Sequence, residues 1–85
     1  MNAFNWTNHA GMEVLIVGLA VYASILPQVV HTGATGRQYR YLLRISFRPL
    51  DSEYTTNVHE YYGSLEKAKQ RAEGLIASWR LEGKI

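Results

Sequence analysis

Residues 14–26, VLIVGLAVYASIL, decide the fold of this chain, because thirteen consecutive positions carry no charged side chain. At its natural limits the apolar segment covers residues 12–30, and as an α-helix it would be about 28 Å long. That length is close to the hydrocarbon core of a bilayer, which is roughly 30 Å thick. All nine Lys and Arg residues follow the segment, beginning with Arg37 and Arg40. Under the positive-inside rule, this pattern predicts a single-pass membrane protein with a cytoplasmic C-terminus.

A buried helix of a soluble, cytoplasmic protein is the alternative for the same segment. Gly18, Tyr22 and Ser24 interrupt its apolar character, and Pro27 would break or kink its last turn. A continuous apolar run of 13 residues is also more typical of a buried core helix than of a membrane span. A signal peptide is a third interpretation, although no basic residue precedes the run.

Residues 39–47 form the clearest periodic pattern in the rest of the chain. Every second residue from Tyr39 to Phe47 is apolar or aromatic, whereas most positions between them are polar or basic. An alternation of period two predicts a half-buried β-strand, and Pro49 ends it. Residues 54–62 are rich in Thr, Tyr and Val, which predicts the returning strand of a hairpin.

An amphipathic helix is expected at the C-terminal end. Ser64 is suited to cap its first turn, and Glu66 is favourable at the positive end of the helix dipole. Apolar residues then recur at helical spacing as far as Trp79, and Gly83 predicts the end of the helix.

These patterns predict an α+β fold of the order αββα, with an apolar helix, a β-hairpin and an amphipathic helix. With 85 residues, 47% of them hydrophobic and 19% charged, the chain is expected to form a single folded domain. The predicted segments are a polar N-terminal segment (1–11), an apolar helix or membrane span (12–30), a glycine-containing loop (31–38) and a ββα module (39–85).

The most specific polar feature is a row of arginines on one face of the strand predicted over residues 39–47. Arg40, Arg44 and Arg48 share one parity, so successive guanidinium groups would project from one side at intervals of about 13 Å. Such a row fits either a solvated strand protected from edge pairing or a surface for an acidic partner. The residues expected to bind a partner are Arg37, Arg40, Arg44, Arg48, Tyr54 and Tyr61.

A protein is the expected partner, because exposed tyrosine together with arginine is typical of protein interfaces. Anionic lipid headgroups fit if the apolar segment spans a membrane. Nucleic acid fits less well, because Tyr39, Tyr41 and Phe47 would point away from the arginines, and base stacking and phosphate contact would not share a surface. The sequence does not indicate an oligomeric state.

The sequence offers no set of residues for catalysis, for a metal ion or for a cofactor. It contains no cysteine, and its three histidines are neither at i,i+4 from one another nor within a carboxylate cluster. The glycines at 33 and 36 resemble the start of a dinucleotide-binding turn, but Tyr39 stands where that pattern needs a third glycine. We therefore expect a protein that is not an enzyme.

Two functional hypotheses follow. The first is a small single-pass membrane protein, an accessory or regulatory subunit whose cytoplasmic ββα module binds a partner through its Arg and Tyr surface. The second is a soluble small inhibitor, of the type found in phages or plasmids, that binds and blocks a protein or a nucleic-acid complex.

Overall fold

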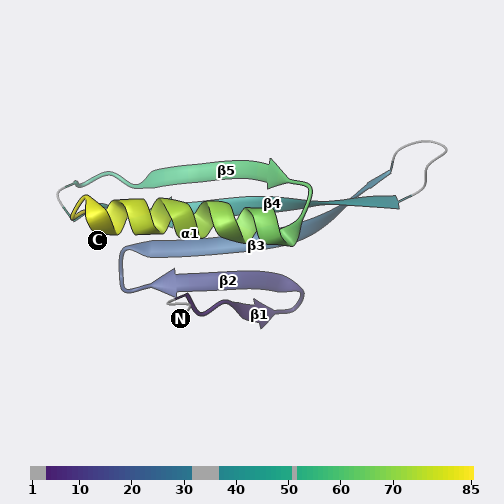
Figure 1. Ribbon diagram of the computed structural model, residues 1–85, viewed down its shortest axis with the longest axis horizontal. Helices are drawn as coiled ribbons and strands as arrows, with labels where there is room; N and C mark the ends of the chain where they lie inside the picture. The colour runs from purple at the N-terminus through teal and green to yellow at the C-terminus, as the bar shows by residue number, and fades with distance from the viewer. Residues whose placement is uncertain (1–3, 32–36, 51) are drawn as a thin grey trace.

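The computed structural model describes residues 4–31, 37–50 and 52–85, and it consists of a five-stranded antiparallel sheet followed by one helix (Figure 1). The strands lie side by side in chain order, so that each strand pairs with the one before it. The elements are β1 (Thr7–His9), β2 (Met12–Val17), β3 (Val21–His31), β4 (Arg37–Phe47), β5 (Thr56–Tyr62) and α1 (Leu65–Leu81).

The predicted N-terminal helix is wrong, and with it the αββα order and the membrane span. Residues 12–30 form β2 and most of β3, which pair as a hairpin with Leu15 opposite Ala23. The chain turns between them at Gly18, whose φ of +56° lies in the left-handed region that glycine tolerates best. No helix in the described part of the chain is long and apolar enough to cross a membrane.

The predicted hairpin and C-terminal helix are present, with shifted limits. The first predicted strand lies within β4, and β5 begins at Thr56, so that Tyr54 precedes it. Residues 32–36 of the predicted glycine-containing loop lie outside the described residues, whereas residues 37 and 38 belong to β4. The Ser64 side chain accepts a hydrogen bond from the Lys67 backbone N–H at 3.2 Å, as expected of a helix cap.

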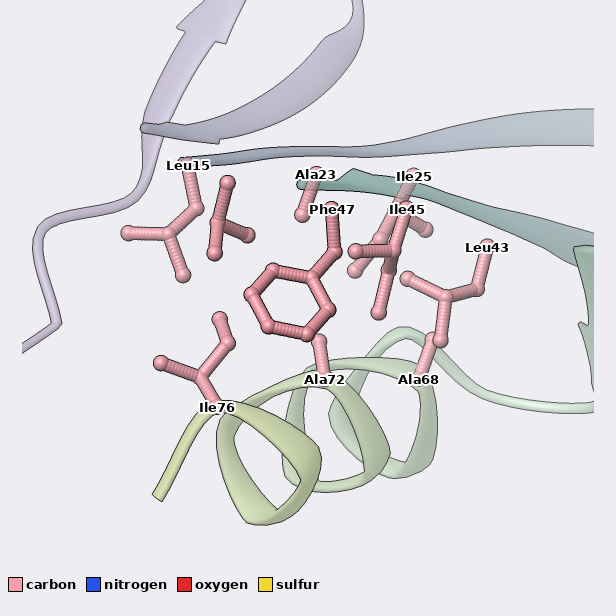
Figure 2. Close-up of a cluster of buried hydrophobic side chains, with 10 residues drawn as sticks. Leu15, Ala23, Ile25, Leu43, Ile45, Phe47, Ala68, Ala72 and Ile76 are labelled. Carbon is pink, nitrogen blue, oxygen red and sulfur yellow. The ribbon is translucent and has the colours of Figure 1, made fainter. Parts of the chain in front are cut away.

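The hydrophobic core lies on one face of the sheet, where α1 covers β3, β4 and β5 (Figure 2). Alternate residues of β3 and β4 point toward the helix, which contributes small or branched side chains from its buried stripe. Phe47 lies at the centre of the cluster, and its ring stacks on Trp79 at a centroid distance of 3.9 Å. The fully buried members are Ala23, Ile25, Leu43, Ala68, Ala72 and Ile76, each with no measurable exposure.

Two polar contacts join the N-terminal strands to the helix. The Trp6 indole N–H donates to a Glu73 carboxylate oxygen at 2.7 Å, and Lys69 forms a 3.2 Å ion pair with Glu13 of β2. These contacts connect the β1 and β2 side of the sheet to the helix, which itself covers β3, β4 and β5.

The hairpin of β3 and β4 extends beyond the neighbouring strands as a two-stranded ribbon, visible at one end of the molecule in Figure 1. The pairing of β2 with β3 ends at Ile25, whereas that of β3 with β4 continues to His31 opposite Arg37. Pro27 lies in this part of β3, opposite Tyr41. Because β2 no longer pairs with β3 there, the N–H that proline lacks is not needed for the ladder.

Candidate binding face

The face of the sheet opposite the helix, called the open face from here on, carries the candidate site. Its side chains alternate along each strand with the residues that face α1, because successive residues of a strand point to opposite sides. Its members on β1 and β2 are Thr7, His9, Met12, Val14 and Ile16. Those on β3, β4 and β5 are Tyr22, Ser24, Leu26, Gln28, Arg40, Leu42, Arg44, Ser46, Asn57, His59 and Tyr61, and Arg48 directly follows β4.

Three of the predicted binding residues, Arg40, Arg44 and Arg48, lie on the open face and are exposed. Tyr61 joins them from β5, and the Arg40 guanidinium lies 4.2 Å above the centre of its ring. Tyr54 lies instead in the connection between β4 and β5, outside the strands that form this face. The side chain of Arg37 is outside the described part of the structure.

The distribution of charge divides the molecule into two unequal sides. The helix, the segment after it and the helix-covered face carry five acidic and five basic residues, namely Glu13, Glu60, Glu66, Glu73, Glu82, Lys67, Lys69, Arg71, Arg80 and Lys84. The described part of the open face carries three arginines and no carboxylate. The helix side is thus neutral, and the open face is positively charged.

Ion pairing follows the same division. On the helix side, Lys69 pairs with Glu13, Arg71 with Glu60 and Lys84 with Glu82, at 3.0–3.2 Å. On the open face, none of the three arginines has a carboxylate partner among the described residues. Arg40 instead donates from Nε to the Gln28 side-chain oxygen at 3.4 Å. These guanidinium groups therefore remain available to an external anion.

Aromatic rings lie on the same face as the arginines, which the alternation within residues 39–47 does not predict. Tyr39, Tyr41 and Phe47 do point to the helix side, but other rings flank the arginines. His59 and Tyr61 lie on β5 with ring centroids 5.6 Å apart. On β3, Tyr22 is 46% exposed, close to the 48% of Tyr61. Stacking and phosphate contact can therefore share one surface.

Sequence reasoning missed two of these rings, Tyr22 and His59, whereas Tyr61 was among the expected binding residues. Tyr22 falls within the apolar segment, so the helical interpretation gave it no place on a sheet. His59 and Tyr61 share a parity within the predicted strand 54–62, and that parity was the available signal for their common side. The alternation did not show that this side faces the same way as the arginines of β4.

A hollow of about 440 Å³ lies in the open face beside the central arginine. Ser24, which is only 7% exposed, lies opposite Arg44, and Arg44 lies opposite His59 on the next strand. Tyr22 and Asn57 also line the hollow. Its polar lining combines a guanidinium, an amide, an imidazole and a hydroxyl, which can hydrogen-bond to an anion or to a polar ring edge.

The described residues show no group of three or more His, Cys, Asp or Glu side chains that could hold a metal ion. The clearest perturbed titrations within the sheet belong to Glu60 and Tyr62, on the helix-covered side of β5. The open face thus offers groups that can bind a ligand through hydrogen bonds and charge.

The fold and the face together define a class, a small antiparallel sheet protein with one helix-covered side and one basic, ring-bearing open side. Comparisons with protein-family models, with curated proteins and with solved structures give no match to this chain. The evidence for a function therefore comes from the open face itself.

Proposed function

We propose that this protein is a binding protein and not an enzyme, and that its open face binds an acidic macromolecule and blocks it. The observation that carries the proposal is the segregation of charge, with Arg40, Arg44 and Arg48 exposed together and without a carboxylate on their face. Cations that only protect a strand from aggregation would gain from nearby acidic partners, such as those of Lys69, Arg71 and Lys84 on the helix side. A partner with negative charge would supply the acidic groups that these arginines lack on their own face.

The dimensions of the open face support a macromolecular partner. Five strands at about 4.8 Å spacing span roughly 19 Å, and the eight residue steps from Arg40 to Arg48 span about 27 Å. Side chains that project from the sheet add to the accessible area of this face. That area is of the same order as the area that one partner buries in a standard interface, about 800 Å². A small anion would contact only one of the three arginines at a time.

Apolar side chains lie beside the arginines and favour a blocking role through tight contact. Ile16 and Leu26 are 63% and 40% exposed, and they continue the open face on the side of β2 and β3. An apolar area beside cationic and aromatic residues is the usual composition of a surface where a partner excludes water. Occupation of the target's surface, with no chemical step, is then sufficient for inhibition.

Charge reversal at the centre of the open face tests this proposal. We expect Arg44→Glu to weaken binding to a fluorescein-labelled polyanion at least about tenfold, because one attraction becomes a repulsion next to two further contacts. The probes are a 15-residue polyglutamate and the oligonucleotide dT15, each followed by fluorescence anisotropy in 50 mM NaCl.

Lys67→Glu is the matched control, because it makes the same change in net charge at an exposed position on the helix side. It should alter affinity less than about threefold, since the charge lies away from the binding face. Equal losses in the two variants would show that net charge alone drives association, and would refute a role for the open face. Circular dichroism checks that both variants are folded.

A further inference from the structure

We propose that the acidic macromolecule is a single-stranded nucleic acid whose phosphates contact Arg40, Arg44 and Arg48 while its bases stack on the neighbouring rings. This inference rests on the proposed function and narrows it to one class of partner. Its basis is the arrangement of rings around the arginines, which an acidic protein surface would not require.

The rings lie on both sides of the arginine row. His59 and Tyr61 are on β5, one strand away from the arginines of β4, and Tyr22 is on β3, one strand away on the other side. Adjacent strands are about 4.8 Å apart, so a chain whose phosphates follow β4 would bring its bases over these rings. Proteins that bind single strands combine a positive track for the backbone with aromatic platforms for the bases.

The contact of Arg40 with Tyr61 extends this platform. The Arg40 guanidinium, 4.2 Å from the ring centre, covers one face of Tyr61, so a base that approaches there would stack on the guanidinium, whose N–H groups can also reach a phosphate. The Gln28 side chain accepts from Arg40 Nε and restrains it further. The site is thus partly organised before a ligand binds, which reduces the entropy lost on binding.

The hollow beside Arg44 has room for a base. Its volume is about 440 Å³, it is open to solvent, and its lining extends from Met12 of β2 to His59 of β5. The Ser46 hydroxyl donates to the Asn57 side-chain oxygen at 3.3 Å, which orients that amide and directs its NH₂ group as a donor. Amide and hydroxyl groups of this kind hydrogen-bond to base edges, and Tyr22 supplies a ring at the border of the hollow.

A single strand uses this surface more completely than a duplex does. In a double helix the bases are stacked on one another, so their faces are not available to Tyr22 or Tyr61. A duplex would contact the arginines through its phosphates and leave the rings unused. The arrangement of the open face therefore favours unpaired DNA or RNA.

The test compares dT15 and rU15 with polyglutamate of the same length and with a 15-base-pair duplex, in 100 mM NaCl. We expect at least one single strand to bind about tenfold more tightly than polyglutamate and than the duplex. Three phosphate contacts predict a slope of about −2 for log K against log salt concentration, and Arg48→Gln should make it shallower by about 0.7.

Substitution of the rings separates stacking from charge. Tyr61→Leu and Tyr22→Leu should each lower single-strand affinity at least about fivefold, whereas Tyr61→Phe keeps a ring and should retain most of it. Tyr54→Leu is the matched control, because Tyr54 is exposed but lies outside the open face. Thermal melting followed by circular dichroism verifies that every variant is folded.

The outcomes distinguish this inference from the proposed function. If polyglutamate binds as tightly as dT15 and rU15, and the tyrosine variants bind normally, the open face is a site for an acidic protein and the nucleic-acid inference is wrong. Equal binding of duplex and single strands also overturns it. If the unmodified protein binds none of these polyanions, both proposals are refuted.

Discussion

At the scale of single residues, a cluster of three side chains fastens the edge strand to the helix. The Glu60 carboxylate of β5 accepts a hydrogen bond from the Tyr62 hydroxyl at 2.7 Å and one from Arg71 Nε of α1 at 3.1 Å. These two bonds hold the pKa of Glu60 below its usual value, and the bond from Tyr62 has the larger effect. Burial, followed by the hydrogen bond to the carboxylate, raises the pKa of Tyr62.

The lowered pKa of Glu60 predicts how stability depends on pH. Its folded-state pKa lies below the unfolded value, about 4.3, so its contribution is present above that value and is lost as pH falls through the lowered pKa. Because the Glu60 and Arg71 side chains are 35% and 47% exposed, solvent screening limits the contribution to about 0.5–1 kcal/mol. Glu60→Gln should lose this amount at pH 7.

Urea denaturation at pH 7 and at pH 3 measures this effect. The difference in unfolding free energy between the natural protein and Glu60→Gln should shrink as the pH falls, because the protonated carboxyl resembles the amide. A difference that stays constant down to pH 3 would contradict a stabilising role for the carboxylate. Glu53→Gln is the control, since Glu53 is exposed in the connection between β4 and β5 and has no ion pair among the described residues.

The sequence predicted single positions well where periodicity within one strand was enough. The common side of Arg40, Arg44 and Arg48 followed from the alternation in residues 39–47, and the structure confirms their placement. The contact between Glu60 and Arg71 could not be predicted in the same way, because it depends on which helix face meets the edge of the sheet. The helix face that contacts the sheet is determined by packing between elements, and it cannot be predicted from the periodicity of a single strand.

At the scale of elements, two glycines have opposite conformational roles. Gly74 is exposed within α1, and a Cβ built there would meet nothing within 4 Å. Gly18, in the turn from β2 to β3, also has open space around it, but its φ is +56°. The same substitution is therefore expected to have opposite effects at the two positions.

Gly74→Ala should raise the free energy of unfolding by about 0.5–1 kcal/mol, because alanine restricts the unfolded chain and favours the helix. Gly18→Ala should lower it by about 1 kcal/mol, since a residue with a Cβ is strained at a left-handed φ. Paired thermal melts measure both changes. A loss of stability in Gly74→Ala would show that this part of α1 is under a constraint that its open surroundings do not reveal.

The failure of the predicted N-terminal helix also belongs to the scale of elements. The turn from β2 to β3 is itself apolar, and Leu19 within it is fully exposed, so composition gave no sign of a break. In β3, both sides carry apolar residues, such as Ile25 toward the helix and Leu26 on the open face, which hides a period of two. The β-branched residues and Gly18 were the available signals.

At the scale of the whole molecule, one core joins β2, β3, β4, β5 and α1, because the helix packs on one side of a single sheet. The two tryptophans report on different parts of this core. Trp79 stacks on Phe47 at the centre, whereas Trp6, before β1, donates to Glu73 of α1. If the core is a single cooperative unit, both regions should unfold together.

Trp6→Phe and Trp79→Phe leave one fluorescent reporter each and test this cooperativity. Within each variant, we expect the urea midpoint from tryptophan fluorescence to coincide with the midpoint from far-ultraviolet circular dichroism. Both midpoints are expected to shift together, because each substitution removes a contact. An earlier fluorescence transition in Trp79→Phe, where Trp6 is the reporter, would show that the N-terminal strands detach before the rest of the sheet unfolds.

The neutral helix side and the positive open face also have a kinetic consequence. A charge confined to one side gives the molecule an electric dipole, and the field of a polyanion turns such a dipole before contact. Collisions would then occur mostly with the open face forward, so fewer encounters are lost to wrong orientation. Added salt should accordingly lower the association rate constant more than it raises the dissociation rate constant. Orientation of the molecule before contact would then contribute to a fast association.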